Sequence, residues 1–120
     1  MTGLIVAMAG SFGAVGRYLM ARAIQRRSDP DVPVGTAAVN LAGSLGLGLV
    51  VGLGVQGDLL AALAGGFAGF TTYSTWMVET ISLTGEGPEG RIRAVANLVG
   101  LMALGLIVAW TGLILGRWFA

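Results

Sequence analysis

Five consecutive hydroxyl side chains, residues 71–75, mark the part of the sequence with the most chemical potential. A glycine-rich stretch, residues 65–69, precedes them, and Glu79 follows. The run lies inside an apolar segment long enough to cross a bilayer, where lipid tolerates neither unsatisfied polar groups nor a lone carboxylate. Glycines and hydroxyls that bond to nearby backbone both weaken a helix. The pattern predicts a helix broken near mid-membrane, whose freed carbonyls can hold a hard cation such as Na⁺.

Beyond the predicted break, Tyr73 and Trp76 are spaced i, i+3, and Glu79 follows Thr75 at i+4. Residues with these spacings lie on one face of a helix. Aromatic rings have positively polarised edges, so this face suits an anion met edge-on. Packing between helices is the other interpretation of the aromatic pair, and spacing alone favours it.

Two further polar positions occur in the preceding segments. Thr36, Asn40 and Ser44 recur every four residues and form one stripe on an otherwise apolar helix. The Asn40 amide either bridges to a neighbouring helix or donates to a dehydrated anion. Arg17 lies well inside the first apolar segment, where it either snorkels to the interface or attracts an anion to a watery vestibule.

The elements that must position these side chains are membrane-spanning helices. The chain has 120 residues, of which 55% are hydrophobic and 11% charged, a balance typical of an integral membrane protein. Apolar runs of about 20 residues predict an all-α fold in a single transmembrane domain, residues 1–120. Its four helices are expected at about 3–25, 34–55, 59–84 and 91–118, with the third one broken.

The arginine distribution predicts the orientation in the membrane. With four spans, the first and third connections share one side and hold Arg26, Arg27, Arg91 and Arg93, whereas the other side has only Arg117. The positive-inside rule then places these connections in the cytoplasm and both termini outside. So strong a bias indicates a chain committed to one orientation in the plasma membrane.

The composition also excludes several classes of function. Without cysteine, histidine or lysine, the chain lacks the side chains for disulfides, thiol catalysis and the usual transition-metal sites. Glu79 has no second intramembrane carboxylate with which to share acid–base work. A net charge of +1 argues against a nucleic-acid partner. A conductor or carrier is therefore indicated, not an enzyme.

Three sequence blocks together resemble the bacterial fluoride channel family, known as Fluc or CrcB. They are residues 10–18 (GSFGAVGRY), residues 35–48, which begin GTAAVNLAG, and residues 69–76 (GFTTYSTW). Their order, their spacing and the four expected spans all match, so the resemblance covers nearly the whole chain. It implies an antiparallel, dual-topology dimer with two narrow pores that pass fluoride passively and lower its cytoplasmic level.

The resemblance also implies roles for single residues. A structural Na⁺ is expected on the backbone carbonyls of Ala68 and Thr71. The anion pathway is expected to use a pore asparagine, a vestibule arginine, two pore aromatics and part of a polar track, which correspond to Asn40, Arg17, Tyr73, Trp76, Glu79 and Thr36.

The chain departs from the family pattern at four positions. Ala68 replaces the usual glycine, Tyr73 and Trp76 replace two phenylalanines, and Leu101 stands where a serine is expected. With the arginine bias, these departures favour a heterodimer with an oppositely oriented paralogue over a homodimer. A pore-silent scaffold subunit is one alternative. A small multidrug-type proton antiporter is another, but its mechanism needs a carboxylate on the first helix.

Overall fold

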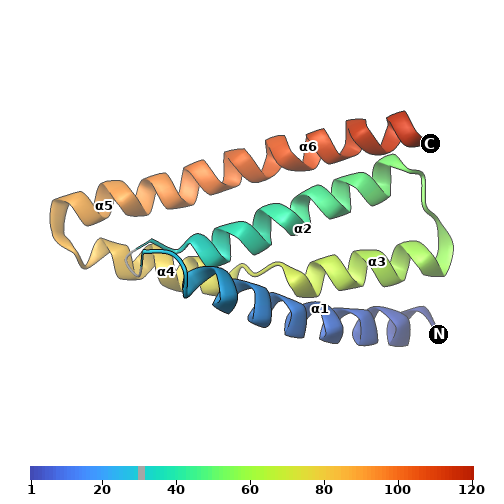
Figure 1. Ribbon diagram of the computed structural model, residues 1–120, viewed down its shortest axis with the longest axis horizontal. Coiled ribbons are helices and arrows are strands. Elements are labelled where there is room, and N and C mark those ends of the chain that lie inside the picture. The colour runs from blue at the N-terminus through green and yellow to red at the C-terminus, as the bar shows by residue number, and fades with distance from the viewer. Residues whose placement is uncertain (30–31) are drawn as a thin grey trace.

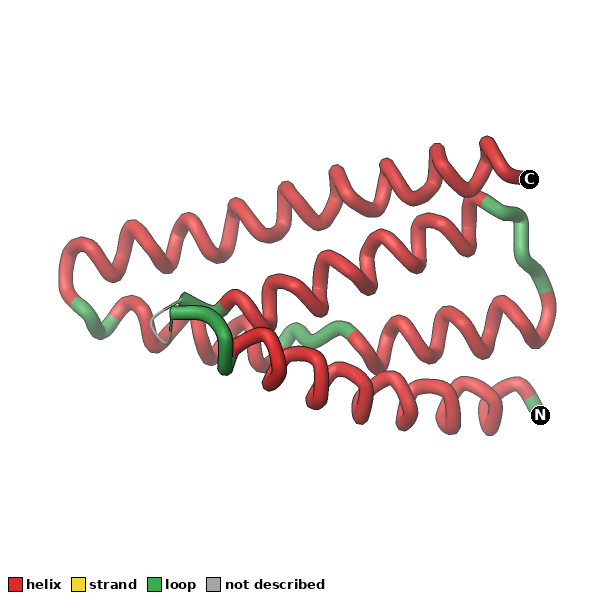
Figure 2. Tube along the Cα trace, in the orientation of Figure 1, coloured by secondary structure: helices red, strands yellow, loops and turns green. Residues whose placement is uncertain are grey.

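The structure is a computed structural model that describes residues 1–29 and 32–120, and within these ranges its regular elements are all helical. The elements are α1 (Thr2–Gln25), α2 (Val34–Gly52), α3 (Gly57–Phe70), α4 (Ser74–Thr84), α5 (Gly87–Val95), the π-helical turn η1 (Ala96–Gly100) and α6 (Leu101–Phe119). They form four roughly parallel rods, with both termini at the same end (Figure 1). The α3–α4 rod is interrupted by a short extended segment, whereas α5, η1 and α6 run on without interruption (Figure 2).

The helices confirm the predicted membrane fold and its broken third span. Within the described part of the chain, three helices are long and apolar enough to cross a membrane, namely Thr2–Gln25, Val34–Gly52 and the continuous Gly87–Phe119. The remaining rod is divided into helices of 14 and 11 residues, and each is shorter than the roughly 20 residues that span a bilayer. Residues 71–73 separate them, where the hydroxyl run begins.

Glycines move three of the predicted boundaries. The predicted second span reaches residue 55, but α2 ends at Gly52 because Gly54 turns the chain with φ +68°. The third and fourth spans begin two and four residues earlier than the predicted residues 59 and 91, since Gly57 and Gly87 also have positive φ and start α3 and α5 directly. Left-handed backbone of this kind is accessible to glycine without strain.

Glycine lets the rods approach closely. Helix α1 lies along α3, and α2 lies along α6. A Cβ added at Gly13 would lie 2.0 Å from the Gly66 carbonyl oxygen, and one at Gly48 would lie 2.1 Å from that of Ala109. Small residues at such crossings permit backbone contact, which is a main source of helix association in lipid.

Large apolar side chains cover much of the outer surface. Phe12 is 74% exposed, Leu106 69% and Trp118 85%, whereas Val39 in α2 is fully buried. Water-facing proteins rarely expose so much contiguous apolar surface. Lipid or another subunit must cover this surface.

We expect Gly13→Ala to destabilise the fold by about 1–3 kcal/mol, the usual cost of overpacking, because the new methyl group meets the α3 backbone. Gly3→Ala is the matched control in the same helix, since nothing lies within 4 Å of a Cβ there. Thermal unfolding in detergent measures both. Equal stability of the two variants would contradict the predicted α1–α3 contact.

Candidate functional site

The break between α3 and α4 is held by one asparagine on α2. The Asn40 side chain donates from Nδ2 to the Thr72 carbonyl at 3.0 Å and accepts the Thr72 amide N–H on Oδ1 at 2.8 Å. Both backbone groups of Thr72 are thereby satisfied outside any helix ladder. In a lipid environment such groups need partners within the protein. Of the two interpretations of Asn40, the structure shows the bridge.

Thr72 also organises the start of α4. Its Oγ1 accepts the backbone N–H of Thr75 at 3.3 Å and donates to Thr75 Oγ1 at 3.0 Å. The N-terminal end of α4, which carries positive partial charge, is therefore fixed beside the break. Thr72 was not among the site residues predicted from the sequence. The available signal was a threonine just before a helix start, a residue type that often bonds to nearby backbone N–H groups.

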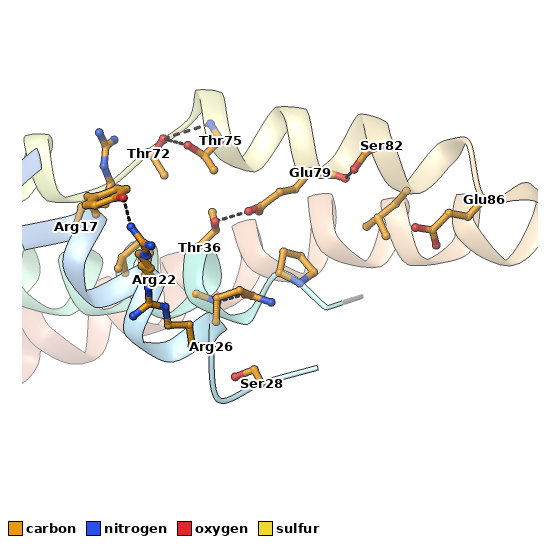
Figure 3. Close-up of a pocket in the computed structure, with 17 residues that line it drawn as sticks. Arg17, Arg22, Arg26, Ser28, Thr36, Thr72, Thr75, Glu79, Ser82 and Glu86 are labelled. Atoms are coloured by element: carbon orange, nitrogen blue, oxygen red, sulfur yellow. Dashed lines mark hydrogen bonds between the residues drawn. The ribbon is translucent and has the colours of Figure 1, made fainter. Parts of the chain in front are cut away.

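A vestibule of about 880 Å³ opens on one side of the break. Figure 3 shows Arg17 and Arg22 of α1, with Arg26 directly after it, on the side of this space opposite Glu79 of α4 and Glu86 before α5. The polar residues that line it are Arg17, Tyr18, Arg22, Gln25, Arg26, Ser28, Thr36, Thr72, Thr75, Glu79, Ser82 and Glu86. Three positive charges on one wall favour the entry of an anion into this space.

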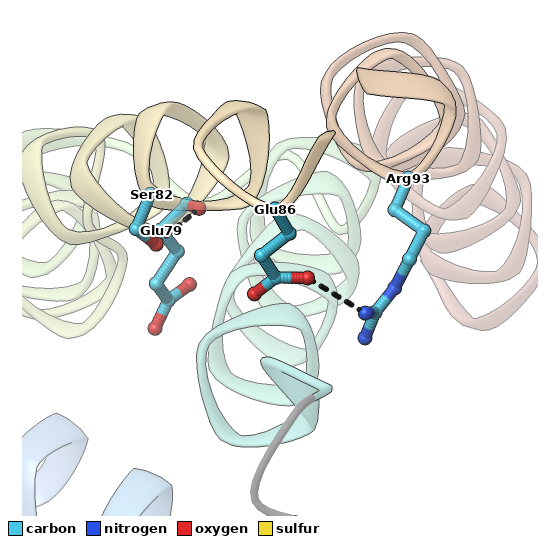
Figure 4. A network of polar contacts seen from close by, with 4 residues as sticks. All are labelled: Glu79, Ser82, Glu86 and Arg93. Carbon is cyan, nitrogen blue, oxygen red and sulfur yellow. Dashed lines mark hydrogen bonds and ion pairs between the residues drawn. The ribbon is translucent and has the colours of Figure 1, made fainter. Parts of the chain in front are cut away.

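The carboxylates on the opposite wall have different partners. Glu79 accepts the Thr36 hydroxyl on Oε1 at 2.5 Å, and its buried Oε2 has no hydrogen-bond partner among the described residues. Glu86 instead pairs with Arg93 of α5 at 2.9 Å (Figure 4). The second pair is exposed on both sides, so solvent weakens it. Thr36 donates its only O–H to Glu79.

A groove of about 390 Å³ opens on the other side of the break and is mainly apolar. Thr72 lines both the groove and the vestibule, so the bridged segment separates the two spaces. The groove collects five residues that the sequence predicts for the site, namely Asn40, Ala68, Thr71, Tyr73 and Trp76. Leu101 lines it too, as an apolar residue.

The two aromatic residues of the groove differ in how far they are exposed. Tyr73 and Trp76 pack edge to face, with ring centroids 6.0 Å apart and planes at 83°. Trp76 is only 9% exposed, whereas Tyr73 is 70% exposed. Trp76 is therefore fixed inside the subunit, and Tyr73 stands on the open side of the groove.

The two carbonyls expected to hold a cation are already partly engaged. Thr71 donates its hydroxyl to the Ala68 carbonyl at 3.3 Å, and Arg17 Nη1 donates to the Thr71 carbonyl at 3.2 Å. Each carbonyl oxygen keeps a second lone pair. Both residues also lie where the C-terminal end of α3 concentrates negative partial charge. Their oxygens fit a hard cation, with Arg17 as a competing positive charge.

Thus the break assembles the predicted residues in two groups. Arg17, Thr36 and Glu79 line the vestibule, while Asn40, Tyr73 and Trp76 line the groove together with Ala68 and Thr71. Arg17 connects the two groups, because its guanidinium donates to the carbonyl of Thr71, a groove residue. Their expected roles in ion binding remain predictions.

We expect Asn40→Ala to expose the Thr72 amide to solvent exchange, because it removes both bonds that hold the break. Asn40→Asp should keep part of the protection, since a carboxylate still accepts the N–H. Hydrogen–deuterium exchange of a peptide containing Thr72 measures this effect. Ser44→Ala, one turn along α2, serves as the control, and exchange in Asn40→Ala no faster than in this control would contradict the bridging role.

Comparison with known proteins places these features in a family. The family model described as CrcB-like protein, Camphor Resistance (CrcB), matches residues 4–113. A protein of Rubrobacter xylanophilus named fluoride-specific ion channel FluC 1 is 44% identical over 98% of this chain and 94% of its own length. Proteins named fluoride-specific ion channel FluC 2 are 40% identical in Mycobacterium tuberculosis, over 96% and 87%, and 41% in Moorella thermoacetica, over 93% of both. The chain is a multi-pass membrane protein and belongs to the CrcB family.

Proposed function

We propose that this chain forms part of a passive fluoride channel. The observation that carries the proposal is the Asn40–Thr72 bridge, which lies between an arginine-lined vestibule and an aromatic groove. The relatives named as fluoride-specific ion channels support the choice of ion. An anion enters at the vestibule, passes the bridged segment and continues along the groove.

The groove provides hydrogen-bond donors that could bind a small anion although none of them carries a full positive charge. One N–H of the Asn40 amide is taken by the Thr72 carbonyl, and we assign the second N–H to the ion. The positive ring edges of Tyr73 and Trp76 supply further weak donors. An ion that loses water needs such replacements, because an unsolvated charge in an apolar space is very costly.

A second subunit completes the pore in this proposal. The groove lies open beside the exposed Tyr73 ring, and large apolar side chains of α1, such as Phe12, are exposed as well. An antiparallel partner would cover these surfaces and close the groove. The arginine bias favours an oppositely oriented paralogue as that partner, and the numbered names FluC 1 and FluC 2 among the relatives agree with paired subunits.

The proposed orientation follows from the same arginines. Arg26 and Arg27 follow the end of α1 that points away from the two termini, and Arg91 and Arg93 lie in α5, which forms the opposite end of the bundle (Figure 1). With this end in the cytoplasm, the three arginines of the vestibule attract cytoplasmic fluoride to the pore. Passive efflux then lowers the internal concentration.

One alternative is favoured by a specific observation. Trp76 is buried in the groove and Leu101 makes part of its wall apolar, which suits a subunit that supports its partner without conducting. The proton antiporter has less support, because α1 contains no carboxylate that could exchange protons with a cationic drug.

A structural Na⁺ is part of the proposal. We assign two of its ligands to the Ala68 and Thr71 carbonyls, which are hard oxygen donors beside the break. Among the described residues no cluster of three His, Cys, Asp or Glu side chains offers another metal site. Two carbonyls do not complete the coordination shell of a cation, so an antiparallel partner would supply further oxygens. The ion would neutralise helix-end charge between the subunits.

Fluoride efflux from liposomes tests the function. With the purified chain and its candidate partner together we expect rapid, passive efflux, and with this chain alone we expect little, because half of the pore is missing. Chloride-loaded liposomes serve as the selectivity control. Robust transport by this chain alone would refute the obligate heterodimer, and no efflux in either preparation would refute the channel.

Replacing Tyr73 or Asn40 in the active complex separates the conducting subunit from the scaffold. We expect Tyr73→Ala or Asn40→Ala to reduce flux through this subunit's pore, because each removes a proposed donor. Unchanged flux in both variants would favour the scaffold role.

If Na⁺ binds the Ala68 and Thr71 carbonyls as proposed, Arg17 should lower the affinity for the cation. Arg17→Gln removes a positive charge from the Thr71 carbonyl, and like charges a few ångströms apart cost about 1 kcal/mol even in water. We therefore expect thermal stabilisation by Na⁺ at about fivefold lower concentration. Arg22→Gln is the control, since Arg22 bonds to Tyr18 instead. A requirement for more Na⁺ in Arg17→Gln would contradict competition at this oxygen.

A further inference from the structure

A π-helical turn lies directly beside the groove tryptophan. Within the continuous rod formed by α5 and α6, residues Ala96–Gly100 form the π turn η1. Within this turn the Asn97 carbonyl accepts the indole N–H of Trp76 at 3.2 Å. Single π turns inside α-helices are frequently found at functional sites. This turn places a carbonyl where the indole needs one.

The Asn97 side chain closes a ring of hydrogen bonds. Asn97 Nδ2 donates to Thr80 Oγ1 at 2.8 Å, and Thr80 Oγ1 donates to the Trp76 carbonyl at 2.8 Å. The ring ties α4 to the π turn at two points one helical turn apart. Thr80 is only 8% exposed, so solvent does not replace these bonds easily.

The ring determines what Trp76 presents to the groove. An indole has a single N–H donor and no acceptor, and that donor is bound to Asn97. Tyr73 packs edge to face against the same ring. Trp76 therefore lines the groove with fixed C–H groups and withholds its N–H. Asn97 and Thr80 do not line the groove themselves.

We propose that Asn97 and Thr80 are positioning residues that hold the Trp76 indole in one orientation for anion passage. This inference rests on the proposed fluoride channel. A ring free to rotate would either obstruct the groove or turn its N–H toward an anion and retain it. The π turn thus supplies the carbonyl that a tryptophan in the wall of the groove needs for its N–H.

A double-mutant cycle in the assembled channel tests the inference. We expect Thr80→Val to lower fluoride efflux about 2- to 10-fold, the equivalent of one hydrogen bond, and Thr80→Ser to restore it. In a Trp76→Phe background, where no N–H needs positioning, Thr80→Val should have no further effect. Thr84→Val is the control, because Thr84 is exposed and its hydroxyl donates to the Ile81 carbonyl within α4.

A second measurement keeps the test independent of transport. With Trp110 and Trp118 replaced by phenylalanine, Trp76 is the only tryptophan. We expect Thr80→Val, but not Thr80→Ser, to shift its emission to longer wavelength and increase quenching by acrylamide. If Thr80→Val does not fold, Asn97→Ala removes the other end of the same bond and takes its place.

The outcomes separate the two proposals. The positioning role would be overturned if Thr80→Val lowered efflux equally with Trp76 intact and in the Trp76→Phe background. It would also be overturned if neither Thr80→Val nor Asn97→Ala changed the Trp76 emission. Absence of fluoride efflux from the unmodified complex, with emission still dependent on Thr80, would overturn the channel function and leave the anchoring of Trp76 supported.

Discussion

The structure depends on the need to satisfy backbone groups where a helix stops inside a membrane. At the end of α3 the chain leaves the helix for three residues, and lipid offers these residues no hydrogen bonds. Asn40 supplies both a donor and an acceptor to Thr72, and Arg17 supplies a donor to Thr71. With these partners the break can persist and expose polar backbone between two cavities. Without them the segment would gain by joining α3 and α4 into one helix.

The same constraint explains where glycine is placed. A break needs partners from α1 and α2, and their side chains reach it only if the rods lie close together. Gly13 and Gly69 permit this at the α1–α3 contact, where an added Cβ would lie 2.0 Å and 2.1 Å from carbonyl oxygens of the facing helix. Close packing and the polar site are therefore linked. The glycines of the α1–α3 contact thereby also allow Arg17 to reach Thr71.

The sequence predicted the elements better than the bonds between them. Hydropathy is a property of whole segments, so the four rods were predictable, and the hydroxyl run located the break to within a few residues. The partner of Asn40 was not predictable, because the bridge joins residues 32 positions apart and requires the packed fold. The π turn had no signal either, since residues 96–100 read as ordinary apolar helix. Hydropathy predicted three helix boundaries a few residues away from their positions in the structure, which are set by glycines with positive φ.

The aromatic wall shows how a departure from a family pattern can be absorbed. Trp76 is larger than a phenylalanine and brings a donor that must be satisfied once buried. The neighbouring rod meets this demand with the Asn97 carbonyl, and Thr80 and the Asn97 amide tie the two helices together. Any buried tryptophan needs an acceptor for its N–H, but the further bonds through Thr80 and the Asn97 amide also hold the two helices in one relative position. The cost of distorting a helix into a π turn is better explained if the orientation of the indole matters to what passes beside it.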